Sequence, residues 1–240
     1  FKKNELKPWQ KREWCIAPEA SATFVWKMED ILEVYQRPYD PLRPVICLDE
    51  LSKQLTKEKH IPIPAKPGAT ERYDTQYERN GTANIFIHTE PLIGKRTVKV
   101  TTARKRKDFA HFLKKLVDVD YQHAETIVLV MDNLNTHDGA SLYETFPPQE
   151  ARRILDRLEI HYTPKHGSWL NMAEIEFSHL SRQCLDRRIP NQETLIQEVK
   201  VWEHNSNQCK SSVNWRFKSS DARIKLKRLY PTIDENGGQI

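Results

Sequence analysis

The chain has 240 residues, enough for one large domain with a proper hydrophobic core. Its 38 Lys and Arg residues against 33 Asp and Glu residues give a formal net charge of +5, which is compatible with a polyanionic partner. Its longest apolar runs are only strand-sized, no signal peptide opens it, and its four cysteines form no CxxC pair, so we expect a cytoplasmic protein without membrane contact or structural zinc.

The first part of the chain predicts a helix followed by a buried strand. Residues 20–35 place apolar side chains at helical spacing, so residues 1–43 are expected to form a linker and a helix. Residues 44–49 are a continuous apolar run that ends in an acid, which is typical of a strand buried on both faces. Residues 51–70, with several lysines and prolines, are expected to be an exposed irregular excursion.

A hairpin is predicted next. Asn80-Gly81 is a dipeptide typical of turns. After it, residues 83–89 and 96–102 are expected to form two strands joined across Gly94. This hairpin should neighbour the first strand in the sheet.

The second half of the chain completes a mixed sheet. Residues 107–117 have helical apolar spacing, and residues 126–131 form a second apolar strand that ends in Asp132. We expect residues 44–190 to form the core and residues 191–240 a basic helical extension. The other predicted elements are helices over 140–146, 150–158, 169–185, 192–204 and 221–229 and a short strand over 159–162.

Two buried strands therefore each end in a carboxylate, Asp49 and Asp132. A charge at such a position is costly unless something compensates it, and a divalent cation would compensate both. Mg²⁺ and Mn²⁺ prefer oxygen ligands, and two such ions about 4 Å apart can activate the attacking oxygen and stabilise the leaving oxygen in phosphodiester cleavage. The alternative is that each acid caps its strand or the helix that follows.

A third acid would be needed to hold a second ion, and the helix predicted over 169–185 offers Glu174 and Glu176. Residues two apart on a helix point about 200° apart, so the two glutamates cannot both serve. Asn171 and Ser178 share the face of Glu174, which favours Glu174, although a single glutamate on such a helix can also be merely solvated. Glu176 is expected to be a solvated or salt-bridged surface residue whose loss costs no more than about 0.5 kcal/mol.

Three motifs occur in order around these acids. They are Cys-Leu-Asp-Glu at 47–50, Val-Met-Asp-Asn-Leu-Asn-Thr-His at 130–137 and Leu-Asn-Met-Ala-Glu at 170–174. With the stretch at 162–169 and the closing Leu-Lys-Arg-Leu-Tyr-Pro at 226–231, the chain resembles the DDE transposases of the Tc/mariner superfamily, specifically the bacterial insertion-sequence 630 group. The likeness covers nearly the whole chain.

The resemblance implies an α/β, ribonuclease H-like fold, a mixed five-stranded sheet flanked by helices in which Asp49 and Asp132 on adjacent parallel strands meet Glu174. It implies metal-dependent cleavage at transposon ends and attack of the freed 3′ hydroxyl on target DNA, usually at a TA dinucleotide. The implied cofactor is two Mg²⁺ ions, replaceable by Mn²⁺, with Asp49 bridging both, Asp132 completing one site and Glu174 the other. The implied partner is double-stranded DNA, bound by a homodimer at the bacterial nucleoid.

Two departures from the family pattern are informative. Many eukaryotic relatives have Asn-Pro-Ile-Glu where residues 171–174 are Asn-Met-Ala-Glu, and Glu174 follows Asp132 by 42 positions, which favours the bacterial branch. The family's N-terminal helix-turn-helix, which reads transposon ends, is expected to be missing from this chain. Sequence-specific end binding is therefore not expected here.

Basic residues predict further contacts to DNA phosphate, although each could equally be an exposed loop residue, a helix start or a solvated helix face. The candidates are Lys165, His166, His137, Arg104, Lys105, Arg106 and Lys107. Two rival functions stay open, namely an inactive or domesticated nucleic-acid-binding fragment and a ribonuclease H-like nuclease that cuts without joining. Intact Asp49, Asp132 and Glu174 favour the transposase over the inactive binder.

Overall fold

The computed structural model describes residues 20–133 and 138–232. A mixed sheet of five strands forms its centre, in the order β3-β2-β1-β4-β5. β2 pairs antiparallel with both β1 and β3, whereas β4 pairs parallel with both β1 and β5. The strands are β1 (Val45–Glu58), β2 (Tyr77–Glu90), β3 (Lys95–Thr101), β4 (Ile127–Met131) and β5 (Leu158–Tyr162).

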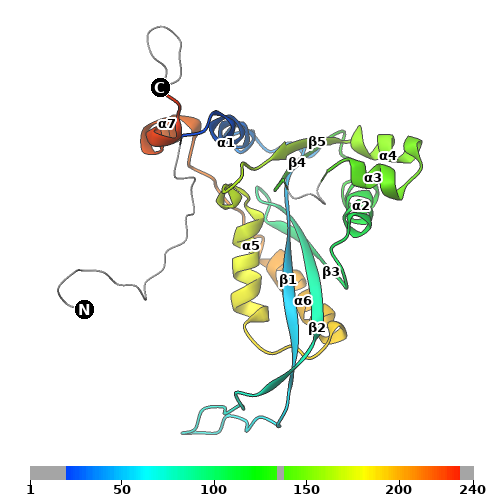
Figure 1. Cartoon of the computed structure of the whole chain (residues 1–240), viewed down its shortest axis with the longest axis vertical. Coiled ribbons are helices and arrows are strands. Elements are labelled where there is room, and N and C mark those ends of the chain that lie inside the picture. The colour runs from blue at the N-terminus through cyan, green and yellow to red at the C-terminus, as the bar shows by residue number, and fades with distance from the viewer. Residues whose placement is uncertain (1–19, 134–137, 233–240) are drawn as a thin grey trace, which may run out of the picture.

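Helices cover both faces of this sheet (Figure 1). α1, α5 and α6 pack on one face, and α2, α3 and α4 pack on the other. The predicted mixed sheet flanked by helices is thereby confirmed. The helices are α1 (Ala22–Val34), α2 (Arg106–Lys115), α3 (Ala140–Thr145), α4 (Pro148–Leu155), α5 (Ala173–Leu180), α6 (Gln192–Cys209) and α7 (Ser219–Lys225).

The alternation of side chains along the central strands explains the three layers. In β1, Val45 and Cys47 join the core beneath α1, α5 and α6, while Ile46 and Leu48 join the core beneath α2 and α4. All five residues of β4 are buried in the same alternating way. Each fully buried aliphatic side chain stabilises the fold by about 1.5–3 kcal/mol, so a strand covered on both faces must read as an unbroken apolar run.

The first strand is much longer than its apolar run. β1 continues past Asp49 to Glu58 and pairs with β2 as far as Tyr77, so the prediction of irregular chain from residue 51 is wrong for residues 51–58. Between β1 and β2, residues 59–76 have little regular structure, and they project from the body of the molecule (Figure 1). The distal part of this ribbon is largely solvent-accessible, so it carries no apolar periodicity that would mark it as strand.

Asn80-Gly81 lies within β2 and does not form a turn. The pairing of β1 with β2 shifts between Gln54 and Thr56, and Gly81 adopts a φ of +83° opposite this shift. The dipeptide therefore forms a β-bulge, for which glycine supplies the left-handed backbone.

The outer edge of β3 is closed by side chains of α6. The N–H of Arg96 donates to Asn207 Oδ1 (2.9 Å), and Asn207 Nδ2 donates back to Arg96 O (2.8 Å). The N–H of Val98 donates to Glu203 Oε2 (3.2 Å). An edge strand normally presents such groups unpaired, so α6 takes the place of a neighbouring strand.

The C-terminal helices share the core of the sheet. Leu195, Val199 and Trp202 of α6 and Ala222 of α7 are buried in one cluster with residues of α1 and β1. No helix in the described ranges is long and apolar enough to cross a membrane. The division at residues 43 and 190 stays a prediction.

Candidate active site

Asp49 and Asp132 lie at the same level, just beyond the parallel pairing of β1 with β4. The last paired residues of β1 and β4 are Cys47 and Val130, and each acid lies two positions beyond that pair. Asp49 is buried, and its Oδ1 accepts the N–H of Glu50 (2.8 Å). Asp49 does not end its strand as predicted, because β1 continues on its pairing with β2, yet the parallel register still aligns the two acids.

Glu174 lies in the first turn of α5 and interacts electrostatically with Asp132. Its side chain is solvent-accessible at the edge of the site. Partial burial raises the pKa of the Glu174 carboxyl, and the negative charge of Asp132 raises it further. The second and third predicted acids are therefore close enough to repel each other.

Asn171 connects the helix that carries Glu174 to the strand that carries Asp49. The expected long helix over 169–185 is divided into a 3₁₀ turn over 168–170, α5 and a π-helical turn over 181–185. Asn171 lies between the first two pieces, fully buried, where its Nδ2 donates to Leu48 O (2.9 Å) and its Oδ1 accepts the N–H of Ala173 (3.1 Å). An asparagine that bonds locally in this way competes with helix formation, which explains the break.

Tyr35 supports the same segment and was missed by sequence reasoning. Its hydroxyl donates to Leu170 O (2.6 Å) and lies 3.4 Å from the N–H of Met172, which can donate to it. Burial raises the pKa of this phenol, so it stays protonated as a donor. The helical spacing of residues 20–35 marks Tyr35 as a core residue, and nothing in that pattern indicates a polar role for its hydroxyl.

The donor set fits a hard divalent cation. Asp49, Asp132 and Glu174 offer only carboxylate oxygens, the ligands that Mg²⁺ and Mn²⁺ prefer. Within residues 20–133 and 138–232, no group of three or more His, Cys, Asp or Glu side chains is gathered closely enough to hold a metal ion. The fit therefore lies in the chemistry of the three acids, and burial, followed by the charge of Asp132, raises the pKa of Glu174.

A cleft of about 790 Å³ opens beside Asp132. One wall is the start of α1 with Lys27, and the other is the loop over residues 163–168. Lys165 and His166, both predicted to contact DNA, are exposed on that loop and line the cleft. The cleft therefore combines positive charge with an acid in its lining, which suits a phosphate backbone near a metal-binding carboxylate.

Four other predicted DNA contacts, Arg104, Lys105, Arg106 and Lys107, do not line this cleft. Arg104 lies 3.4 Å from Glu50, the residue after Asp49. Arg106 is paired with Asp138 (3.0 Å), while Lys105 and Lys107 are exposed at the start of α2. His137 lies outside the described residues.

Glu176 is salt-bridged, which was one of the two predicted alternatives, but the prediction that it lies at the surface is wrong. Glu176 is only 3% exposed, its Oε2 lies 2.7 Å from Arg96 Nε, and its Oε1 accepts from Arg96 Nη2 (2.9 Å). As predicted, Glu174 and Glu176 point in different directions from α5. However, the side of α5 that carries Glu176 faces β3 and α6, not solvent. Breaking a buried pair of this kind costs about 3–5 kcal/mol, far above the expected 0.5 kcal/mol.

Comparison with known proteins identifies both a family model and a fold. The model described as DDE superfamily endonuclease matches residues 44–196. A Mos1 transposase paired-end complex with left transposon end is 12% identical with a TM-score of 0.55, over 85% of this chain and 60% of that one. The Mos1 mariner paired end complex with Mn is 12% identical with a TM-score of 0.53, over 88% and 65%. The catalytic domain of Mos1 mariner transposase is 11% identical with a TM-score of 0.52, over 80% and 85%.

At this identity the solved structures establish the fold, and the expected ribonuclease H-like architecture is confirmed. The chain spans about 60% of the length of the first of these transposases. No curated protein matches the chain.

Proposed function

This chain belongs to the DDE superfamily of endonucleases, and we propose that it is the catalytic core of a transposase that cuts DNA at transposon ends and joins the freed 3′ end to target DNA. One observation carries the proposal. Asp49 and Asp132 are aligned on adjacent parallel strands, and Glu174 on α5 interacts electrostatically with Asp132. The similarity in fold to complexes of Mos1 transposase with transposon DNA supports the same conclusion.

Three carboxylates would hold the metal in this proposal. Asp49 would bridge two ions, Asp132 would complete one site and Glu174 the other, and the Mos1 complex with Mn supports a divalent metal. Such ions, when bound, activate the attacking oxygen and stabilise the leaving oxygen. Asn171 and Tyr35 fix the segment that leads into α5, so the start of the helix that carries Glu174 is anchored before DNA arrives.

The cleft beside Asp132 would hold the DNA backbone. Lys27, Lys165 and His166 line it from two sides, and a cationic side chain can neutralise phosphate charge there. We further propose double-stranded DNA as transposon end and as target, a homodimer on DNA, and TA-type target sites in a bacterial cell. These finer assignments, with membership of the insertion-sequence 630 group, rest on the three sequence motifs.

A nicking assay on supercoiled plasmid with Mn²⁺ tests the proposal. The wild-type chain should nick the plasmid, and Asp132→Asn should not, because it loses a charge that holds the metal. Asp186→Asn, at an exposed aspartate outside the site, is the matched control and should nick normally. A labelled duplex with a free 3′ hydroxyl should also be joined to the plasmid. Nicking without joining would indicate the nuclease, and DNA binding without either would indicate the inactive binder.

DNA binding should weaken steeply as salt rises, with little dependence on sequence. The side chains that line the cleft suit contacts to phosphates, and each neutralised phosphate contributes a slope of about −0.9 in a plot of log K against log salt. Lys27→Ala should reduce this slope by about 1, measured by fluorescence anisotropy on two unrelated duplexes. Lys200→Ala, at an exposed lysine of α6, serves as the control. Equal slopes for both variants, or salt-independent binding, would contradict the proposed path of the DNA.

A further inference from the structure

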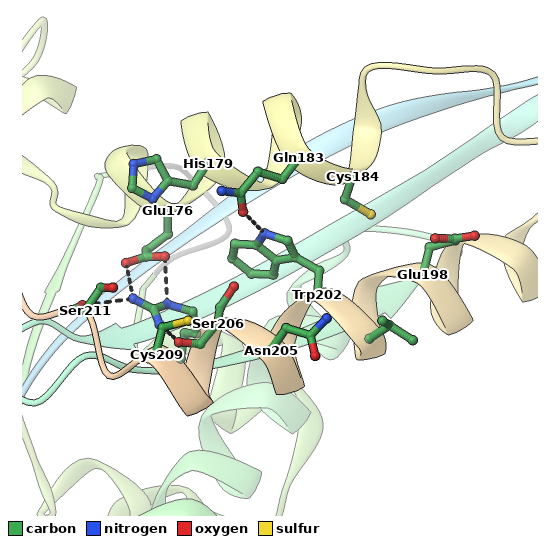
Figure 2. A pocket seen from close by; sticks show the side chains of 12 residues that line it. Glu176, His179, Gln183, Cys184, Glu198, Trp202, Asn205, Ser206, Cys209 and Ser211 are labelled. Atoms are coloured by element: carbon green, nitrogen blue, oxygen red, sulfur yellow. Dashed lines mark hydrogen bonds and ion pairs between the residues drawn. The ribbon is translucent and has the colours of Figure 1, made fainter. Parts of the chain in front are cut away.

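A buried ion pair lies at one end of a second pocket, of about 430 Å³, between α5 and α6 (Figure 2). Arg96 and Glu176 are each only 3% exposed. Arg96 also donates to three carbonyls from three different segments, Gly94 O (3.1 Å), Ser206 O (2.8 Å) and Ser211 O (3.1 Å). The guanidinium therefore connects the β2–β3 turn, α6 and the chain after α6 to a single carboxylate on α5.

The Arg96 side of this pair is rigidly held. Asn207 bonds both backbone groups of Arg96, as it closes the edge of β3. Gly94, at a φ of +65°, packs directly on the backbone of Ser211, where an added Cβ would lie only 2.6 Å from the Ser211 carbonyl. Nothing larger than glycine fits there, so the turn and the chain after α6 form one tightly packed unit.

The α5 side of the pair has less support from its own structure. The eight residues of α5 continue directly into the five-residue π-helical turn over 181–185, a length that is still marginal for an isolated helix, so packing must define its orientation. Its buried face consists of Ala173, Phe177 and Leu180, and Glu174 and Glu176 flank this face on opposite sides. A side-chain end lies about 6 Å from a helix axis, so a rotation of about 20° would move the Glu174 carboxylate by about 2 Å.

We propose that the Arg96–Glu176 pair is the positioning element that sets the rotation of α5 and thereby places Glu174 beside Asp132. The inference rests on the proposed function, because Glu174 needs this placement only if its carboxylate holds a metal ion. Catalytic and metal-binding groups must be held within about 0.5 Å and 10–20° of their working geometry, and a two-point contact to a rigid anchor achieves this. Arg96 and Glu176 touch neither metal nor DNA in this arrangement, so they are positioning residues.

Glu176→Gln tests the inference because it keeps the length of the side chain and one hydrogen-bond acceptor but removes the charge. Mn²⁺ binding is measured by isothermal titration calorimetry without DNA, and nicking is measured over a Mn²⁺ series. The Mn²⁺ concentration at the midpoint should rise at least about tenfold in both measurements, since a displacement of about 1 Å at a catalytic group can cost about a hundredfold. Saturating Mn²⁺ should restore part of the nicking rate.

Leu142→Ala is the control for lost stability. Leu142 is fully buried in α3 on the opposite face of the sheet, so its truncation lowers the melting temperature without a contact to α5. At a temperature where both variants are folded, its Mn²⁺ midpoint should stay within about twofold of wild type. Arg96→Lys, which keeps the charge but loses the planar fork, should shift the midpoint in the same direction and replaces Glu176→Gln if that variant does not fold.

The outcomes separate the two proposals. Wild type that neither binds Mn²⁺ nor nicks DNA contradicts the proposed function, and the inference falls with it. If wild type is active and Glu176→Gln or Arg96→Lys keeps the wild-type midpoint, only the positioning role is wrong. An equal shift in Leu142→Ala would reduce the pair to a general contribution to stability.

Discussion

Glu174→Gln should lower Mn²⁺-dependent plasmid nicking by roughly 10³-fold or more while the fold stays intact. Loss of one of three metal-holding charges removes several kcal/mol of transition-state stabilisation, and each tenfold loss of rate corresponds to about 1.4 kcal/mol. The rate is measured on supercoiled plasmid with matched circular dichroism spectra. Glu193→Gln, at an exposed glutamate in the first turn of α6, is the control and should nick normally.

The metal-free stability of Glu174→Gln adds a second check. The pKa of Glu174 is raised in the folded protein, by burial first and by Asp132 second, so its ionised form is disfavoured by folding. Stability is therefore lost as pH rises above the ordinary carboxyl pKa, and the variant should escape this loss. At neutral pH without metal it should melt no lower than wild type. If the variant still nicks the plasmid, or if it melts well below wild type, Glu174 does not belong to the metal site.

Arg96→Ala should destabilise the fold far more than the loss of an exposed arginine does. The substitution leaves Glu176 as a buried charge without its partner and removes the donor to three carbonyls, and one-sided loss of such a pair costs about 3–5 kcal/mol. The free energy of unfolding is measured by urea denaturation. The control is Arg152→Ala, which breaks an exposed ion pair between α4 and Asp156 at its C-terminal end and should cost only about 0.3–0.5 kcal/mol.

A double variant separates the penalty of the orphaned charge from the value of the pair. Arg96→Met combined with Glu176→Met leaves no buried charge, so it should recover part of the stability that Arg96→Ala loses. Recovery should be incomplete, because the carbonyls of Gly94, Ser206 and Ser211 still lose the guanidinium as donor. A cost below about 1 kcal/mol for Arg96→Ala would show that water or another side chain replaces the guanidinium.

The parts of the fold that the sequence predicts best are those buried on both sides. β4 and the start of β1 read as continuous apolar runs because helices cover both faces, and the alignment of Asp49 with Asp132 follows from their parallel pairing. The rest of β1, from Leu51 to Glu58, could not be predicted. It is strand because it pairs with residues 77–85 of β2, and its side chains are mostly in contact with water, so they form no apolar pattern.

The site shows the same division between local and tertiary information. Helical spacing separates Glu174 from Glu176 correctly, because the angle between two side chains of a helix is a local property. What covers each side chain is a tertiary property, and here it is Arg96, 80 residues away, that covers Glu176. The hydroxyl of Tyr35 and the amide of Asn171 act through contacts with segments that are even more distant in sequence, which no pattern within a short window reveals.

The closure of β3 by α6 also bears on how this protein avoids self-association. Strand addition to an open edge begins fibril growth, and here Asn207 and Glu203 occupy the N–H and C=O of Arg96 and the N–H of Val98, which an incoming strand would need. An incoming strand could pair with β3 only after α6 had moved away. The side chain of Arg96 also bonds the last turn of α6 through Ser206 O, so Arg96→Ala should weaken one of the contacts that hold α6 over this edge and raise self-association together with the loss of stability.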